Sequence, residues 1–278
     1  MVDLDEYREK SLDSWERFSS NWEDERDFMA EKAGGVRERM VERLDPQAGE
    51  TILELAAGAG ETGLAIAERL GDDGRLIMTD FAPGMVEATR RRGEELGVSN
   101  VEYRVLDAER MDLDDDSVDG VDCRFGYMLM ADPAKALAET RRVLRDGGRL
   151  VFAVWGPPQE NLWAAIPGMT MVELGHMPAP EPQAPGIFAM GDPERISELV
   201  NGAGFGDPQI EQVDVDWGYT NPDEHWEKTL KLAAPIADAY ASLEPEAQDE
   251  VHRKVTERVA EQIQGGGLRG RVHVVHAS

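Results

Sequence analysis

The sequence predicts an α/β fold with a mostly parallel, doubly wound sheet that is covered by helices on both faces. Three observations support this prediction. Short apolar runs alternate with amphipathic stretches of helical periodicity between residues 51 and 155. The links between them are short, and glycine or proline stands at several of their boundaries. The resulting β-α-β order places parallel strands side by side, and ligands of such sheets bind beyond the carboxyl ends of the strands.

Residues 3–44 are predicted to be helical. Their large apolar residues recur at steps of three, four and seven positions among charged residues, which forms one apolar face. These residues are Leu12, Trp15, Phe18, Trp22 and Met29. The aromatic members either dock the helix on the core or cover a bound ligand. Asp45-Pro46 ends the helical stretch, because a residue before proline avoids the helical region.

The core elements follow in alternation. Strands are predicted at 51–56, 75–79, 101–106, 118–125 and 149–155, and helices at 60–70, 83–96 and 133–144. Gly71 and Gly97 fit the ends of the first two helices, and Pro83 fits a first helical turn. Residues 146–148, Asp-Gly-Gly, are predicted to form a turn.

The character of the chain changes after residue 155. Residues 156–191 are rich in Pro, Gly and Met without clear periodicity, which predicts a lid or a substrate loop. Asp192-Pro193 is predicted to open a helix that ends near Ala203, because Asp suits the N-cap and Pro the first position. Strands are predicted at 210–217 and 271–277, with mostly helical residues at 223–264 between them.

These elements divide the chain into four predicted parts. An N-terminal helical cap covers residues 1–45, and a cofactor-binding core covers residues 46–155. A lid-like insertion covers residues 156–191. Residues 192–278 complete the core around a helical insertion at 221–264. That insertion either helps to cap the substrate pocket or forms a surface decoration or dimer interface, so a homodimer is compatible with the sequence.

The composition narrows the function classes. The formal net charge of this acidic chain is −27, and such a surface repels phosphate backbones, so nucleic acid is not expected as a substrate. No window approaches the ~18 consecutive apolar residues of a membrane span. The acidic N-terminus does not resemble a secretory signal, so we expect a cytoplasmic protein. Cys123 is the single cysteine, and no His/Asp/Glu spacing stands out as a metal site, so no metal is expected.

A glycine-rich turn follows the first core strand. Gly58-Ala-Gly60-Glu-Thr-Gly63 fits the pattern G-x-G-x-x-G between a strand and a helix, and Asp80 ends the next strand. Glycines permit a tight turn and close backbone approach, and the helix N-terminus offers unpaired N–H groups. An acid at the end of the second strand suits ribose hydroxyls. The pattern is compatible with a dinucleotide as well as with S-adenosylmethionine (SAM).

Three features favour SAM over a nicotinamide dinucleotide. Glu54 lies inside the first strand, where a buried carboxylate needs a partner; an ammonium group would supply one and a pyrophosphate would not. Asp107 ends the third strand, where it either accepts a hydrogen bond from an adenine amino group or serves only as a turn residue. Glu61 lies in the first helical turn and would repel a pyrophosphate.

From about residue 15 to residue 155 the sequence resembles the class I SAM-dependent methyltransferases, in particular the UbiE-like (type 11) group. The resemblance is carried by ILELAAGAGETG at 52–63, by RLIMTDFAPGMVEATRRR at 75–92 and by the block from VEYRVLDAERMD to GGRLVFAVW at 101–155. It implies a Rossmann-like, seven-stranded sheet with an antiparallel last strand, formed by residues 210–217 and 271–277. It also implies an enzyme with SAM as cofactor and S-adenosylhomocysteine (SAH) as its product.

The resemblance further implies roles for individual residues. Glu54 would hold the methionine amino end through water, and Ala56, Gly58 and Gly60 would form the wall under the methionine and ribose. Asp80 would bind both ribose hydroxyls, with Phe81 and Met85 packed against the adenine and ribose. Asp107 would accept from the adenine amino group, helped by the Ala108 N–H, and the Arg124 carbonyl would receive the ammonium group. Glu54 replaces the commoner Asp, and Ala56 an often-seen Gly.

The methyl acceptor and a general base are less well defined. The candidates for a base are His176, His225, Tyr7, Tyr127 and Tyr219. Met169, Met171, Met177 and Trp163 suggest an adaptable apolar surface, which favours a small or medium, partly apolar acceptor. Quinone precursors, sterol- or polyketide-like metabolites and simple amines all remain open, as does the methylated atom (O, N or C). The alternatives are a SAM-fold binding or regulatory protein without turnover and a NAD-dependent oxidoreductase.

Overall fold

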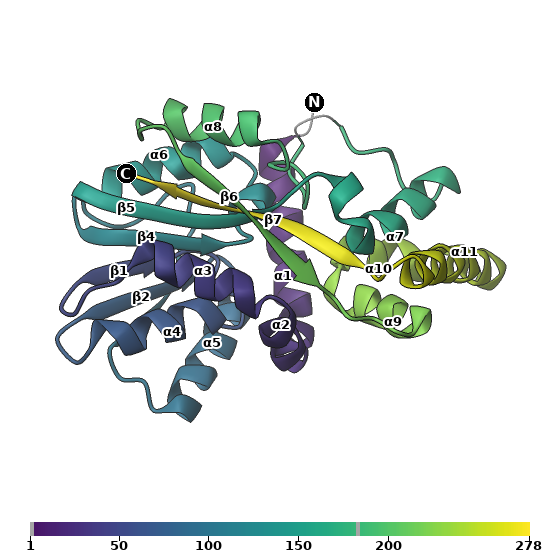
Figure 1. Cartoon of the computed structure of the whole chain (residues 1–278), viewed down its shortest axis with the longest axis horizontal. Helices are drawn as coiled ribbons and strands as arrows, with labels where there is room; N and C mark the ends of the chain where they lie inside the picture. The colour runs from purple at the N-terminus through teal and green to yellow at the C-terminus, as the bar shows by residue number, and fades with distance from the viewer. Residues whose placement is uncertain (1–2, 182–183) are drawn as a thin grey trace.

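One sheet organises the fold (Figure 1). The computed structural model describes residues 3–181 and 184–278, so residues 182–183 of the predicted lid and residues 1–2 of the predicted cap lie outside the described residues. Seven strands are arranged in the order β3-β2-β1-β4-β5-β7-β6. They are β1 (Thr51–Glu54), β2 (Arg75–Asp80), β3 (Val101–Val105), β4 (Val118–Arg124), β5 (Leu144–Trp155), β6 (Gln209–Asp216) and β7 (Arg269–Ala277). Only β7 runs antiparallel to its neighbours, which confirms the predicted sheet.

Helices cover both faces of this sheet. On one face lie α3 (Gly34–Leu44), α4 (Glu61–Leu70) and α5 (Pro83–Leu96), and on the other lie α6 (Pro133–Val143) and α8 (Pro193–Gly202). Central strands β1, β4 and β5 are therefore buried between two helical layers, and their apolar residues such as Leu53, Val121 and Phe152 are fully enclosed. The Asp192 side chain caps α8 at the Glu194 N–H, as the sequence predicts.

A second group of helices lies beyond the carboxyl ends of the parallel strands (Figure 1). It consists of α7 (Leu162–Glu173), α9 (Pro222–Leu232), α10 (Ala234–Ala241) and α11 (Pro245–Gln264). A short 3-10 turn at Pro158–Glu160 leads from β5 to α7, and another at Tyr127–Leu129 leads from β4 to α6. The first helices, α1 (Leu4–Asp24) and α2 (Arg26–Lys32), run between this group and the sheet. The carboxyl edge of the sheet is therefore enclosed by parts of the chain that are far apart in sequence.

Helix α1 is attached mainly through polar contacts. None of its residues is buried, although Trp15, Phe18 and Trp22 are half-buried. On the core side, the Glu16 carboxylate accepts a hydrogen bond from the Gly84 N–H at 2.8 Å. Just after α1, the buried Glu25 carboxylate pairs with two lysines of α9, Lys228 and Lys231. The helix thus connects the sheet layer to the helices beyond it.

Several boundaries differ from the sequence prediction. The N-terminal helical stretch is interrupted at Glu25 and Ala33, and β1 stops at Glu54 because Ala56 adopts a left-handed backbone conformation with φ 52°. Residues 146–148 are not a free turn. They belong to a bulge inside β5, where Val118 pairs with Leu144 but Gly120, two residues later, pairs with Arg149. Helix α7 was not predicted, because it contains Pro167 and lacks an amphipathic pattern.

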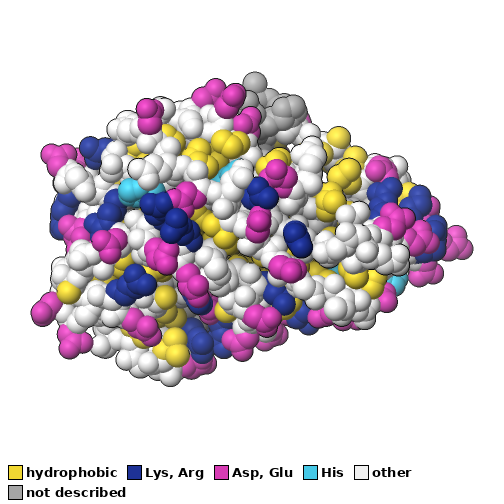
Figure 2. Space-filling model, viewed as in Figure 1, with side chains coloured by type: hydrophobic (Ala, Val, Ile, Leu, Met, Phe, Trp, Pro, Cys, Tyr) yellow, Lys and Arg dark blue, Asp and Glu magenta, His cyan; other side chains and the backbone are white. Residues whose placement is uncertain are grey.

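The surface carries the charge that the composition predicts. On the face drawn in Figure 2, acidic and basic side chains are interleaved over both the sheet layer and the outer helices.

In the part of the chain that the structure describes, no helix has the length and apolarity needed to cross a bilayer. The same part contains no group of His, Cys, Asp and Glu side chains suited to a metal ion.

Candidate active site

Hydrogen bonds fix the glycine-rich turn against β2 and α5. Gly58 and Gly60 have φ angles of 55° and 85°, which glycine adopts readily. The Ala57 N–H donates to the Thr79 carbonyl at 2.9 Å, and the Thr89 hydroxyl donates to the Gly58 carbonyl at 2.6 Å. A Cβ atom on Gly60 would lie 2.9 Å from the Thr89 methyl group. A Cβ atom on Gly58, in contrast, would have no atom within 4 Å. A ligand can therefore approach the backbone of the turn closely at Gly58.

Asp80 stands at the carboxyl end of β2, beside this turn. One carboxylate oxygen accepts from the Gly58 N–H and the other from the Ala82 N–H, both at 3.0 Å. Burial raises the pKa of Asp80 to about 6, while the hydrogen bonds from Ala82, Gly58 and Phe81 oppose that rise. Each carboxylate oxygen can accept a further hydrogen bond, so both remain able to bind hydroxyl groups of a ligand.

Glu54 ends β1 and points under the start of α4. Its Oε1 accepts from the Gly63 N–H at 2.9 Å, and its side chain fills the space where a Cβ of Gly63 would stand. Its Oε2 has no hydrogen-bond partner among the described residues, although the residue is only 2% exposed. Burial, reinforced by the Asp122 carboxylate, raises its pKa well above the ordinary value. An unpartnered buried carboxylate oxygen fits the positively charged amino group of SAM.

The other predicted cofactor residues lie along the same edge of the sheet. Phe81 is half-buried just after β2, and Met85 is buried in the first turn of α5. Asp107 is exposed after β3, where it accepts from the Glu109 N–H at 2.9 Å, and Ala108 beside it is buried. Arg124 ends β4. The order β3-β2-β1-β4 brings these residues together at the point where the strand order reverses between β1 and β4.

The candidate bases are in different environments. The Tyr127 hydroxyl is fully buried against Thr140 at 2.6 Å, on the α6 side of the sheet. The Tyr7 hydroxyl donates to the Leu129 carbonyl at 3.0 Å, and His176 is half-buried in the turn after α7. Tyr219 is buried, and burial raises the pKa of its hydroxyl. The structure brings two of the five candidates together: the Tyr219 and His225 rings are in edge-to-face contact, with centroids 5.1 Å apart.

His225 has the most distinctive environment of the five. Its Nε2 lies 2.7 Å from the Trp163 carbonyl, which can only accept, so Nε2 carries the proton and Nδ1 is a bare acceptor. That carbonyl is free because Pro167, four residues later in α7, has no N–H to donate to it. Nδ1 is buried without a partner among the described residues, and burial lowers the pKa of the ring. His225 is therefore a neutral hydrogen-bond acceptor at neutral pH.

A chain of aromatic rings was not predicted as a unit. The Phe125 ring, immediately after β4, stacks on Trp155 at the end of β5, with centroids 4.5 Å apart and planes 2° apart. Trp155 contacts Trp163 at 4.8 Å, and Trp163 contacts Trp217 at 4.2 Å. Phe125 and Trp217 directly follow strands, and Trp155 ends one. Aromatic residues at the carboxyl ends of predicted strands are therefore the feature of the sequence that could have indicated this chain of rings. They form an apolar wall that starts beside the predicted cofactor residues.

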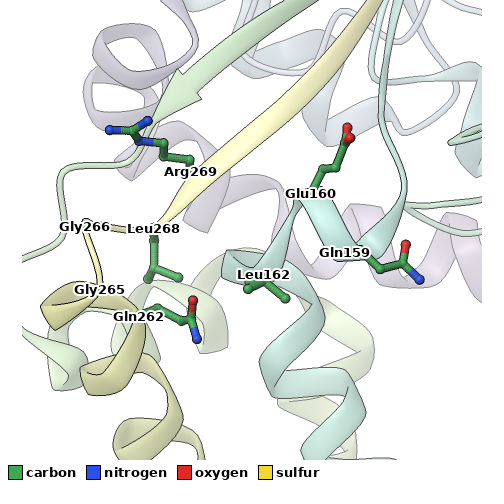
Figure 3. A pocket seen from close by; sticks show the side chains of 9 residues that line it. Gln159, Glu160, Leu162, Gln262, Gly265, Gly266, Leu268 and Arg269 are labelled. Atoms are coloured by element: carbon green, nitrogen blue, oxygen red, sulfur yellow. The ribbon is translucent and has the colours of Figure 1, made fainter.

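A separate cavity of about 320 Å³ lies at the outer helices (Figure 3). Its lining comes from the start of α7, the end of α11 and the start of β7, and consists of Gln159, Glu160, Leu162, Gln262, Gly265, Gly266, Gly267, Leu268 and Arg269. None of these residues was predicted to bind the cofactor. The candidate active site at the carboxyl edge of β1–β4 therefore shares no residue with this cavity.

A seven-stranded sheet of this order, with an acid at the end of β1, a glycine-rich turn and a second acid at the end of β2, defines the class I SAM-dependent methyltransferases. Residues 9–165 match the ubiE/COQ5 methyltransferase family, which is more than half of the chain. The chain belongs to this family. It is a SAM-dependent methyltransferase, and these findings do not favour the oxidoreductase or the protein without turnover.

Individual relatives support the assignment. The chain is 35% identical to demethylmenaquinone methyltransferase of Clavibacter sepedonicus over 58% of this chain and 67% of that protein. It is 27% identical to demethylmenaquinone methyltransferase of Paenarthrobacter aurescens (strain TC1), over 76% of this chain and 84% of that protein. Among solved structures, the YcgJ protein of Bacillus subtilis matches 87% of this chain and 96% of its own with a TM-score of 0.57 and 19% identity, which supports the fold alone.

Proposed function

We propose that the methyl acceptor is a planar, largely apolar aromatic metabolite of the quinone-precursor class, methylated on a ring carbon. The observation that carries the proposal is the stack of Phe125 on Trp155, which begins next to Arg124 at the carboxyl end of β4. A flat ring placed against Phe125 would extend this stack, and aromatic pairs favour such offset contacts. Two relatives in the family are named for demethylmenaquinone, which makes this compound the first acceptor to test.

The residue roles in this proposal are those that the family resemblance implies, and the geometry of the edge is compatible with them. Asp80 holds the two ribose hydroxyls, Asp107 accepts from the adenine amino group, and Glu54 faces the amino end of the methionine part. Ala56, Gly58 and Gly60 form the wall under the methionine and ribose, Phe81 and Met85 pack against the adenosine, the Ala108 N–H assists at the adenine, and the Arg124 carbonyl receives the ammonium group.

The cofactor supplies an activated methyl group on its sulfonium, so the protein mainly orients the acceptor and excludes water. The aromatic wall would orient a flat acceptor by stacking, and the helices beyond the carboxyl ends of the strands would limit the access of water (Figure 1). Of the candidate bases we retain His225, whose unpartnered Nδ1 can accept a proton from an acceptor hydroxyl. The charge of −27 supports a small-molecule acceptor rather than nucleic acid, and a cytoplasmic location stays a prediction.

The proposal is tested by incubating the purified protein with methyl-labelled SAM and chemically reduced demethylmenaquinone. We expect label in the naphthoquinol ring and a mass increase of one methylene unit. If the same preparation binds SAH by calorimetry but transfers no label to this acceptor or to related quinols, the acceptor class is wrong. A simple amine that accepts the label efficiently would contradict the proposal as well.

Replacing Phe125 by Leu is expected to raise the KM for the quinol about fivefold, because an aromatic stack contributes roughly 1 kcal/mol beyond burial of area. The KM for SAM should stay within twofold of the wild-type value. The matched control is Phe152→Leu, since Phe152 pairs with Cys123 in β4 and points to the opposite face of the sheet. That variant should lose stability and keep both KM values. Equal KM values for the quinol in Phe125→Leu and the wild type would show that Phe125 does not contact the acceptor.

A further inference from the structure

Asp122 is a buried carboxylate that no predicted role explains. It lies in β4 directly beside Glu54 of β1, because these two residues are paired in the parallel register of the sheet. Paired residues of neighbouring parallel strands point to the same face, so both carboxylates point toward the α3–α4 layer. Asp122 is 0% exposed, and neither of its oxygens has a hydrogen-bond partner among the described residues. With Oε2 of Glu54, three carboxylate oxygens are unpartnered at one place.

The surrounding charges do not neutralise this pair. Arg124 is two residues further along β4 on the same face, and it forms no ion pair with any residue that the structure describes. Arg37 of α3 and Glu61 of α4 lie 3.6 Å apart and pair with each other. The charged groups that act on the pair are Arg124 of β4 and Asp80 of β2. Glu61 of α4 and Arg37 of α3 act on Arg124 in turn. The pair itself affects the titration of Cys123, Tyr127 and Tyr103, which lie in or near β3 and β4.

One guanidinium therefore faces two carboxylates inside the protein. Two carboxylates that share a buried site cannot both ionise without a second positive charge, because desolvation and mutual repulsion both disfavour the doubly charged state. A proton on one of them leaves a single negative charge, which Arg124 balances. An ammonium group at the same place would balance the second negative charge instead.

We propose that Glu54 and Asp122 hold one proton between them in the cofactor-free protein, and that the ammonium group of the incoming cofactor displaces this proton to the solvent. The cofactor then meets two carboxylates at its amino end, and binding is coupled to the release of one proton. This inference rests on the contact between Glu54 and the amino group proposed above, and it assigns Asp122 as a positioning residue.

The electrostatics of the pair agree with this inference. Burial raises the pKa of Asp122 to about 8, and the Arg124 guanidinium only partly opposes that rise. Because burial raises the pKa of both carboxyl groups, the cofactor-free pair retains a proton at neutral pH, and the cofactor must displace it. The affinity for SAH should therefore rise as the pH rises through the neutral range.

The same proton affects folding. The unfolded carboxyl groups lose their protons at about pH 4, whereas the folded pair retains a proton at neutral pH because burial raises the pKa of both groups. The folded pair therefore binds more protons than the unfolded one above about pH 4, and its contribution to the free energy of unfolding should fall as the pH rises toward neutrality. An Asp122→Asn variant should show a shallower fall.

The direct test is calorimetric titration of SAH into the full-length protein at pH 7, in two buffers with different ionisation enthalpies. We expect the wild type to release close to one proton per SAH and Asp122→Asn to release close to none. The matched control is Asp119→Asn, because Asp119 lies in the same strand but pairs with Arg145 at the surface; it should release as many protons as the wild type. SAH binding without proton release in the wild type, or equal release in Asp122→Asn, would overturn the inference.

A second measurement uses the wild type alone, in case the Asp122 variant does not fold. 5′-Methylthioadenosine contains the adenosine but lacks the aliphatic ammonium group of the homocysteine part, so its binding should release no proton. Proton release equal to that of SAH would show that the proton comes from another group and would refute the inference.

The assignment of Glu54 is tested separately with Glu54→Gln. If this variant binds SAH as tightly as the wild type, Glu54 does not interact with the amino group of the ligand. In that case the inference about the shared proton is wrong as well. If Glu54→Gln weakens SAH binding but the wild type releases no proton on binding SAH, the assignment of Glu54 stands and only the inference about the shared proton is overturned.

Discussion

An Asp80→Ala variant is expected to bind SAH at least tenfold more weakly than the wild type. Hydrogen bonds to a charged group contribute ~1.5–3 kcal/mol, and Asp80 can offer one oxygen to each ribose hydroxyl. The variant also loses the acceptors of the Gly58 and Ala82 N–H groups, which hold the glycine-rich turn in place. Both effects weaken binding. Isothermal titration calorimetry measures the change.

Two further variants make this result specific. Asp112→Ala removes an exposed aspartate from the loop after β3 and should leave the affinity unchanged. Asp80→Asn keeps the shape of the side chain but offers a single acceptor oxygen, so its affinity should lie between those of wild type and Asp80→Ala. An unchanged affinity in Asp80→Ala would refute the assignment of this residue to the ribose.

A Gly63→Ala variant is expected to be destabilised by ~1–3 kcal/mol and to bind SAH poorly. Alanine normally stabilises a helix interior relative to glycine by ~1 kcal/mol, so the usual expectation is reversed here. The reason is steric: the new Cβ would overlap Oε2 of Glu54 and come within 2.8 Å of its Cδ. The carboxylate would be displaced from the Gly63 N–H that it now accepts from. Chemical denaturation and calorimetry measure the two effects.

The control for Gly63 is Gly35→Ala in α3, where no atom lies within 4 Å of the added Cβ. This variant should be as stable as the wild type or slightly more stable. The double variant Gly63→Ala/Glu54→Ala should recover stability relative to Gly63→Ala, because the overlapping carboxylate is gone, but it should not recover SAH binding. Full binding in Gly63→Ala would show that Glu54 does not need its present position.

The fold was largely predictable because its signals are local. Each strand of the core is a short apolar run, and the caps at Gly97 and Asp192 end or begin helices where the sequence indicates. The candidate cofactor site was predictable for the same reason: Glu54, the glycine-rich turn and Asp80 follow one another within a single β-α-β unit.

The parts that were missed depend on contacts between distant residues. The role of Asp122 requires the register of β1 against β4, which no local pattern contains. Helix α7 was hidden by Pro167, whose missing N–H is compensated by His225, 62 residues away from the Trp163 carbonyl that it contacts. The bulge at 146–148 looks like a turn in sequence because Asp-Gly-Gly is typical of turns, and Gly147 does adopt a positive φ of 77° within the strand.

A crystal structure of the protein with SAH tests the central claim most directly. We expect the ribose hydroxyls within hydrogen-bond distance of both Asp80 oxygens, the adenine amino group near Asp107, and the amino group of the homocysteine part beside Glu54 and Asp122. The sulfur should face the Phe125 ring. SAH bound at the cavity beside Gly265–Gly267, or bound at the carboxyl edge with its ribose away from Asp80, would contradict this account.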